Sequence, residues 1–246
     1  MALDPVFLAR RAGLELDDWQ AALVRSTARQ MLLLCSRQSG KSTTSALLAV
    51  DEAMHRAPAL VLLLAPALRQ SQELFRKIKG VLGALGEDAP PVEQESALSL
   101  EFATGSRIVC LPGKESTIRG FSAVSLLVVD EAARVPDPLY QAVRPMLAIS
   151  AGRLVLLSTP FGKRGFFHHE ATEGGPGWER VTITAHDCPR IDPAWLAEER
   201  RRIPDLFFRS EYLCEWVDAD DQVFASDIVM AALSDDVRPL FAREAA

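Results

Sequence analysis

Residues 31–43 read MLLLCSRQSGKST, and this stretch decides the fold. An apolar run of strand length is followed by a short polar turn and then by Gly-Lys-Ser at the start of a helical pattern. This order is typical of a phosphate-binding loop, where backbone N–H groups at a helix N-terminus point at phosphate oxygens. Gly40 would let the chain pass close to the phosphates, Lys41 would reach the β- and γ-phosphates, and the Ser42 hydroxyl would bind Mg²⁺. Cys35 stands where such loops usually have glycine, so the interpretation requires a second motif.

The composition is that of an ordinary soluble globular protein. The 246 residues are 48% hydrophobic and 24% charged, enough to form a large core. The four cysteines form no CxxC pair, which favours a reduced, cytoplasmic compartment. The net charge of −6 excludes a uniformly basic nucleic-acid-binding surface but leaves room for a local basic patch. The apolar runs are too short to span a bilayer, so we expect no membrane association.

Strand and helix patterns alternate along most of the chain. Apolar runs of strand length occur at Met31–Cys35, Leu60–Ala65, Ile108–Leu111, Ser125–Val129 and Arg153–Ser158. Helical patterns lie at Leu16–Ala28, Ser42–Arg56, Ala67–Leu85, Pro138–Leu147, Pro193–Arg202 and Pro204–Trp216. A hairpin is expected within Leu98–Leu111 and a last strand at Val181–Thr184. Continuous apolar runs separated by helices predict an α/β fold with a mostly parallel sheet flanked by helices, of the P-loop NTPase (ASCE/RecA-like) class.

A second motif lies at residues 126–131, which read LLVVDE. It is a strand pattern that ends in two adjacent carboxylates. Asp130 would hold Mg²⁺ through its water shell, and Glu131 would orient and deprotonate the water that attacks the γ-phosphate. Alone, the motif could be a strand followed by a solvated acidic turn. The motif follows the Gly-Lys-Ser loop in the chain, and each of the two motifs stands at the end of an apolar run. Their joint occurrence in this order favours nucleotide hydrolysis.

With both motifs in place, the chain resembles the large terminase subunits of tailed bacteriophages, the ATPases that pump DNA into empty proheads. Residues 36–42 are similar to the variant phosphate loop of that family, which often lacks the first glycine and carries an internal arginine, here Arg37. Asp18-Trp19-Gln20 resembles the family's adenine-recognition motif. The resemblance runs from about Trp19 to Phe224.

Two further segments extend the resemblance. Ile118-Arg119-Gly120 is similar to the segment whose arginine reaches the nucleotide of a neighbouring subunit. Ser158-Thr159-Pro160 is similar to the coupling motif that senses the γ-phosphate. Without the resemblance, Trp19 would be a core residue, and Gln20 would lie on the exposed face of an amphipathic helix.

The loop, the acidic motif and the resemblance together predict one site for ATP and Mg²⁺. The catalytic candidates are Glu131, Lys41, Arg119 and Arg37. The nucleotide-binding candidates are Trp19, Gln20, Ser36, Arg37, Gln38, Ser39, Gly40, Lys41, Ser42, Thr43, Ser158 and Thr159. The metal-binding candidates are Ser42 and Asp130.

The resemblance also implies a function and partners. It implies an ATP hydrolase that couples hydrolysis to translocation of double-stranded DNA, working as a homo-oligomeric ring on the portal protein and with the small terminase subunit. Residues 1–217 would form the ATPase domain and residues 218–246 a linker or tail. Large terminases usually carry a second, RNase-H-like nuclease domain. The chain ends near where that domain would begin, so we expect no DNA cleavage by it.

Two other functions stay open at this point. A helicase-like DNA translocase would use the same motifs, but it generally needs a second motor domain, for which residues 186–246 are too few. A non-catalytic nucleotide-binding or assembly module would bind ATP without hydrolysing it. The DNA-contacting surface is also open. The cations Arg69, Arg76, Lys77 and Lys79 are one candidate for it.

Overall fold

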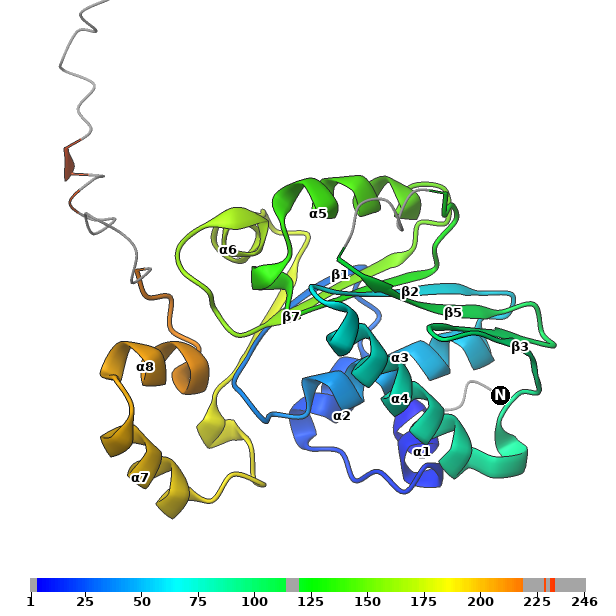
Figure 1. Ribbon diagram of the computed structural model, residues 1–246, viewed down its shortest axis with the longest axis horizontal. Helices are drawn as coiled ribbons and strands as arrows, with labels where there is room; N and C mark the ends of the chain where they lie inside the picture. The colour runs from blue at the N-terminus through cyan, green and yellow to red at the C-terminus, as the bar shows by residue number, and fades with distance from the viewer. Residues whose placement is uncertain (1–3, 114–119, 219–227, 229–230, 233–246) are drawn as a thin grey trace, which may run out of the picture.

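The computed structural model describes residues 4–113, 120–218, 228 and 231–232. In this part of the chain, eight strands form one sheet in the order β3-β4-β5-β2-β6-β7-β1-β8 (Figure 1). The strands are β1 (Gln30–Cys35), β2 (Leu60–Ala65), β3 (Val92–Glu95), β4 (Ser99–Phe102), β5 (Arg107–Pro112), β6 (Leu126–Asp130), β7 (Arg153–Ser158) and β8 (Glu179–Ile183). Across the sheet from β5 through β2, β6, β7 and β1 to β8, each pair of neighbouring strands is parallel. β4 runs antiparallel to both of its neighbours, β3 and β5. The predicted α/β fold with a mostly parallel sheet is confirmed.

Helices cover both faces of the sheet. Figure 1 shows α1 to α4 on one face, α5 and α6 on the other, and α7 and α8 at one end of the molecule. Their bounds are α1 (Pro5–Arg11), α2 (Asp18–Arg25), α3 (Lys41–His55), α4 (Leu68–Leu85), α5 (Asp137–Val143), α6 (Gly165–Thr172), α7 (Pro193–Arg202) and α8 (Asp205–Leu213). None of these described helices combines the length and apolar character needed to cross a bilayer.

Side chains of the central strands alternate between two cores. In β1, Met31, Leu33 and Cys35 pack with α1 to α4, whereas Leu32 packs with α5 and α6. All four are at most 1% exposed. Because successive residues of a strand point to opposite faces, a strand covered on both faces must be apolar at every position. This explains the continuous apolar runs in the sequence.

Among the described α-helices and strands, α1, β3 and α6 were not predicted. The strand β3 reads VEQE and is exposed at every position. It lies at the edge of the sheet, where charged side chains discourage pairing with another chain, and therefore it carries no apolar signal. The helix predicted over Pro138–Leu147 ends at Val143 and continues as a 3-10 turn, because Pro145 has no N–H to donate. The predicted arginine at position 119, and the predicted tail except for residues 218, 228, 231 and 232, lie outside the described residues.

Candidate nucleotide-binding site

The predicted phosphate loop lies at the carboxyl end of β1, where open α/β sheets bind ligands. The loop is tied to β8, because the Ser36 N–H donates to the Ile183 carbonyl over 2.8 Å. Gly40 caps α3 with a φ of +95°. A Cβ atom at that position would lie 2.7 Å from Gln20 Nε2. The positive φ therefore favours glycine at position 40, and any larger residue would also displace the Gln20 amide.

Cys35, the departure from the common loop pattern, belongs to the strand and not to the loop. It is the last residue of β1 and pairs in register with Ile183 of β8. Its side chain is fully buried in the core beneath the loop, and burial raises the pKa of its thiol. A small apolar side chain thus fills the position, and the loop keeps its place without the usual glycine.

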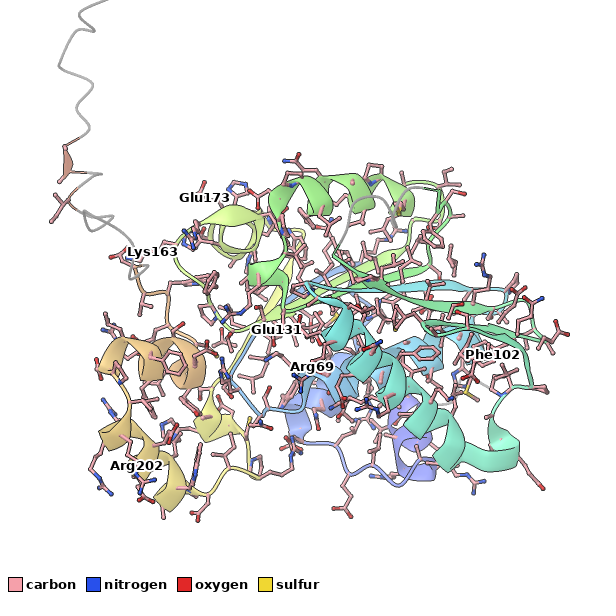
Figure 2. The ribbon with its side chains drawn as sticks, in the orientation of Figure 1. Arg69, Phe102, Glu131, Lys163, Glu173 and Arg202 are labelled. Carbon is pink, nitrogen blue, oxygen red and sulfur yellow. The ribbon has the colours of Figure 1, made fainter. Side chains whose placement is uncertain are left out.

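Lys41 and Glu131 meet across the site. Lys41 Nζ lies 3.2 Å from Glu131 Oε1. Burial acts to lower the pKa of Lys41, but the carboxylates of Glu131 and Asp130 outweigh it and leave that pKa raised. The lysine is therefore a charged ammonium, although its residue is only 8% exposed. Figure 2 shows Glu131 near the middle of the molecule.

Ser42 and Asp130 form a second contact beside the first. Ser42 Oγ donates to Asp130 Oδ2 over 3.1 Å, and Asp130 Oδ1 accepts the Glu131 N–H over 3.0 Å. Burial and then the charge of Glu131 raise the pKa of the Asp130 carboxyl, although Lys41 and Ser42 act in the opposite direction. A hydroxyl and a carboxylate that share one position are the kind of oxygen ligands that Mg²⁺ takes beside phosphates. The predicted metal-binding residues therefore fit the ion.

Ser158 is the last residue of β7, the strand between β6 and β1, and Thr159 follows it. Ser158 is fully buried and Thr159 is 2% exposed. Within the described residues, the Ser158 hydroxyl has no hydrogen-bond partner, and the same holds for the buried hydroxyl of Ser39 in the phosphate loop. A buried polar group without a partner is costly, so each hydroxyl is available to hydrogen-bond a polar ligand or an ordered water.

The adenine-motif residues Trp19 and Gln20 lie on α2. Trp19 is half-buried and packs against the core on the α1 to α4 face, as a large aromatic side chain is expected to do. Gln20 is only 3% exposed, so the exposed position that its helical pattern predicts is wrong. Gln20 Oε1 accepts the Asp17 N–H over 2.9 Å, and Nε2 donates to Thr44 Oγ1 over 3.0 Å. These bonds hold the Gln20 amide against the phosphate loop.

A cavity of about 510 Å³ joins most of the predicted residues. It is lined by Arg37, Gln38, Gly40, Lys41, Ser42, Thr43, Gln70, Lys77, Glu131, Arg134, Thr159 and Glu211. The predicted residues that do not line it are Trp19, Gln20, Ser36, Ser39, Asp130 and Ser158, and Arg119 lies outside the described part of the chain. Lys77, one of the candidate DNA-contacting cations, donates to Thr43 Oγ1 over 3.2 Å and so points toward this cavity.

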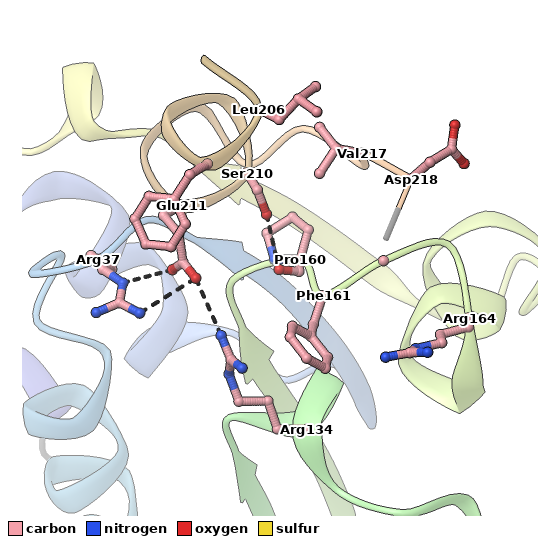
Figure 3. Close-up of a pocket in the computed structure, with 12 residues that line it drawn as sticks. Arg37, Arg134, Pro160, Phe161, Arg164, Leu206, Ser210, Glu211, Val217 and Asp218 are labelled. Atoms are coloured by element: carbon pink, nitrogen blue, oxygen red, sulfur yellow. Dashed lines mark hydrogen bonds and ion pairs between the residues drawn. The ribbon is translucent and has the colours of Figure 1, made fainter. Parts of the chain in front are cut away.

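Arg37 reaches from the loop to Glu211 on α8. Arg37 Nε lies 2.8 Å from Glu211 Oε2, and Arg134 Nη2 lies 3.2 Å from Glu211 Oε1. Figure 3 shows both guanidinium groups directed at this one carboxylate. Neither Arg134 nor Glu211 was predicted, because they come from segments 77 residues apart and neither belongs to a recognisable motif.

Comparisons with known proteins agree with this geometry. A family model described as "Terminase large subunit, T4likevirus-type, N-terminal" matches residues 32–229. The large terminase subunit of Thermus virus P23-45 is 29% identical over 240 residues, which cover 84% of this chain and 50% of that protein. The chain thus spans about half the length of this curated relative.

Solved structures of large terminases also resemble this chain. The ATPase domain of the large terminase of Thermus phage P74-26 matches with a TM-score of 0.76 and 26% identity, covering 85% of this chain and 97% of that one. The large terminase of a thermophilic bacteriophage, solved in complex with ATP-gamma-S, matches with a TM-score of 0.65 and covers 82% of this chain and 53% of that one. Its identity is 16%, so this likeness concerns the fold alone.

Proposed function

Because the chain belongs to the family of T4-type large terminase subunits, matching its N-terminal part, we propose that it hydrolyses ATP to drive phage DNA packaging. The observation that carries the proposal is the pair of contacts between the loop and the acidic motif. Lys41 meets Glu131, and Ser42 meets Asp130, at the carboxyl ends of β1 and β6. Lys41, Ser42 and Glu131 line one cavity, and Asp130 lies directly behind Ser42.

In the proposed reaction, the backbone N–H groups of residues 36–42 and the N-terminus of α3 bind the phosphates. Lys41 pairs with Glu131 in the structure. A bound γ-phosphate would attract the Lys41 ammonium and leave the Glu131 carboxylate free to accept a proton from the attacking water. Because Lys41 would leave Glu131 for the γ-phosphate, Glu131 would become an active base only when a nucleoside triphosphate is bound.

The other predicted residues would complete the site. Ser42 and Asp130 would hold Mg²⁺, which when bound neutralises charge on the β- and γ-phosphates. The unpartnered Ser158 hydroxyl and the neighbouring Thr159 would hydrogen-bond the γ-phosphate, and their strand would report its loss. Trp19 and Gln20 would contact the adenine, and Arg37 would contact the phosphates. Arg119 would act on the nucleotide of a neighbouring subunit.

The proposed motor couples hydrolysis to translocation of double-stranded DNA. It would work in the host cytoplasm as a homo-oligomeric ring on the portal protein, with the small terminase subunit. We assign residues 1–217 to the ATPase domain and the remaining residues to a linker or tail. The 97% coverage of the P74-26 ATPase domain supports this division.

The test is the ATPase rate as a function of protein concentration, with and without double-stranded DNA. We expect the rate per chain to rise steeply with concentration, because each site needs an arginine from a neighbour, and to rise further with DNA. Binding of ATP without hydrolysis, even at high concentration with DNA, would indicate a non-catalytic module. Strand displacement by the isolated chain would instead indicate a helicase-like translocase.

A further inference from the structure

Glu211 is a buried carboxylate held between two arginines. Its side chain is 5% exposed, and it accepts hydrogen bonds from Arg37 and Arg134. Its backbone carbonyl also accepts the Arg37 N–H over 2.9 Å. A carboxylate at this depth needs cationic partners, because an unpaired buried charge is strongly unfavourable. The two arginines supply those partners and satisfy Glu211.

Arg134 lies where three parts of the site meet. It ends the 3-10 turn Ala132–Arg134, directly after Glu131, whose φ of +50° turns the chain at the end of β6. Its guanidinium carbon lies 4.2 Å from the ring centroid of Phe161, which follows Ser158-Thr159-Pro160. Arg134 also lines the cavity that contains Lys41. Arg134 thus connects the acidic motif, the Ser158-Thr159-Pro160 segment and α8.

Arg134 retains capacity for another acceptor. Among the described contacts, it donates to Glu211 through Nη2 alone, whereas Arg37 donates through both Nε and Nη2. Its side chain is 33% exposed, so an incoming ligand can reach it. A guanidinium with free N–H groups in a phosphate-binding cavity matches the geometry of phosphate oxygens.

We propose that Arg134 is a further phosphate-binding residue, which exchanges Glu211 for the terminal phosphate of a nucleoside triphosphate. Glu211 is then a positioning residue: it holds Arg134 at the cavity until the phosphate arrives, and it competes with the phosphate for the same guanidinium. This inference rests on the proposed function, since it requires a nucleoside triphosphate in the cavity. It concerns the γ-phosphate specifically, and a diphosphate has no group at that place.

The test compares ATP-gamma-S and ADP affinities of Arg134→Ala, Arg134→Lys and the wild type by titration calorimetry. We expect Arg134→Ala to weaken ATP-gamma-S binding by about tenfold or more, as for loss of a charge-assisted hydrogen bond, and ADP binding by less than about threefold. Arg134→Lys should restore part of the affinity. The matched control is Arg144→Ala, which removes an arginine that pairs with buried Glu170 at 3.3 Å but does not line the cavity, and it should change neither affinity.

A second measurement tests the competition. Glu211→Gln keeps the size of the side chain and removes its charge, so ATP-gamma-S should bind about threefold or more tightly. The gain should shrink in the Arg134→Ala background, where only Arg37 remains to be released. Glu170→Gln is the control acid.

The outcomes separate this inference from the proposed function. Suppose that the wild type hydrolyses ATP but Arg134→Ala binds ATP-gamma-S as tightly as the wild type, or loses as much affinity for ADP as for ATP-gamma-S. Then only the role of Arg134 is wrong. An equal gain from Glu211→Gln in both backgrounds would overturn the exchange of partners. A wild type that binds neither nucleotide would overturn the proposed function and this inference with it.

Discussion

The Ser42 hydroxyl donates a hydrogen bond to Asp130 Oδ2 over 3.1 Å, and this contact joins segments 88 residues apart. Ser42 is in the first turn of α3, and Asp130 is the last residue of β6. Ser42 belongs to the phosphate loop and Asp130 to the acidic motif. Their contact places the phosphate loop and the acidic motif at one point, which a chance Gly-Lys-Ser or an isolated acidic turn would not require.

Replacing Ser42 by alanine should weaken the use of Mg²⁺. The Ser42→Ala variant loses a metal-binding oxygen, so the Mg²⁺ concentration for half-maximal ATPase activity should rise about tenfold, equivalent to about 1.4 kcal/mol. The control is Ser45→Ala, one turn along α3, where the hydroxyl donates to the Lys41 carbonyl over 3.0 Å. Equal Mg²⁺ dependence in the two variants would remove Ser42 from the metal site.

Two glycines should respond to alanine in opposite directions. Gly40→Ala forces a side chain into a left-handed conformation and against Gln20, and should lower the free energy of unfolding by about 1–2 kcal/mol or more. Gly80, inside α4, has nothing within 4 Å of an added Cβ. Gly80→Ala should therefore raise the free energy of unfolding by about 0.5–1 kcal/mol. Urea unfolding measures both changes, and a stabilising Gly40→Ala would contradict the loop geometry.

Gln20 should contribute to both nucleotide choice and stability. Gln20→Ala removes the bonds to Asp17 and Thr44, so the free energy of unfolding should fall by about 1 kcal/mol. If its amide contacts adenine, the preference for ATP over GTP should fall as well. Thr44→Val is the control, because it removes one partner of Gln20 but leaves the amide. A preserved ATP preference in Gln20→Ala would limit Gln20 to a structural role.

Arg119 should act between subunits. A mixture of Arg119→Ala and Lys41→Ala proteins should show more ATPase activity than either alone. The first variant supplies an intact phosphate loop and the second supplies the arginine, so mixed neighbours form complete sites. Activity is measured at a fixed total protein concentration while the ratio is varied. A mixture no more active than the sum of its parts would place the arginine in its own subunit, or outside the reaction.

Most of the fold was readable from the sequence, but only part of the site was. β1 and β6 are continuous apolar runs with a diagnostic polar end, so the placement of Lys41 and Asp130 followed from local sequence. Glu211 reaches the cavity only through the tertiary packing of α8, and Arg134 reaches Glu211 from the turn after β6. A single arginine or glutamate outside a motif gives no local sequence signal for such a contact. The burial of Gln20 was missed for the same reason, because its partner Thr44 lies on another helix.

The role of Glu131 as the base is tested by single-turnover hydrolysis with the Glu131→Gln variant, with ATP, Mg²⁺ and DNA present. The substitution keeps the shape of the side chain and removes the base. We expect the hydrolysis rate to fall by about 100-fold or more, as for loss of a general base, while the dissociation constant for ATP stays within about threefold of the wild-type value. A hydrolysis rate within about threefold of wild type would contradict the account, because Glu131 would then not activate water.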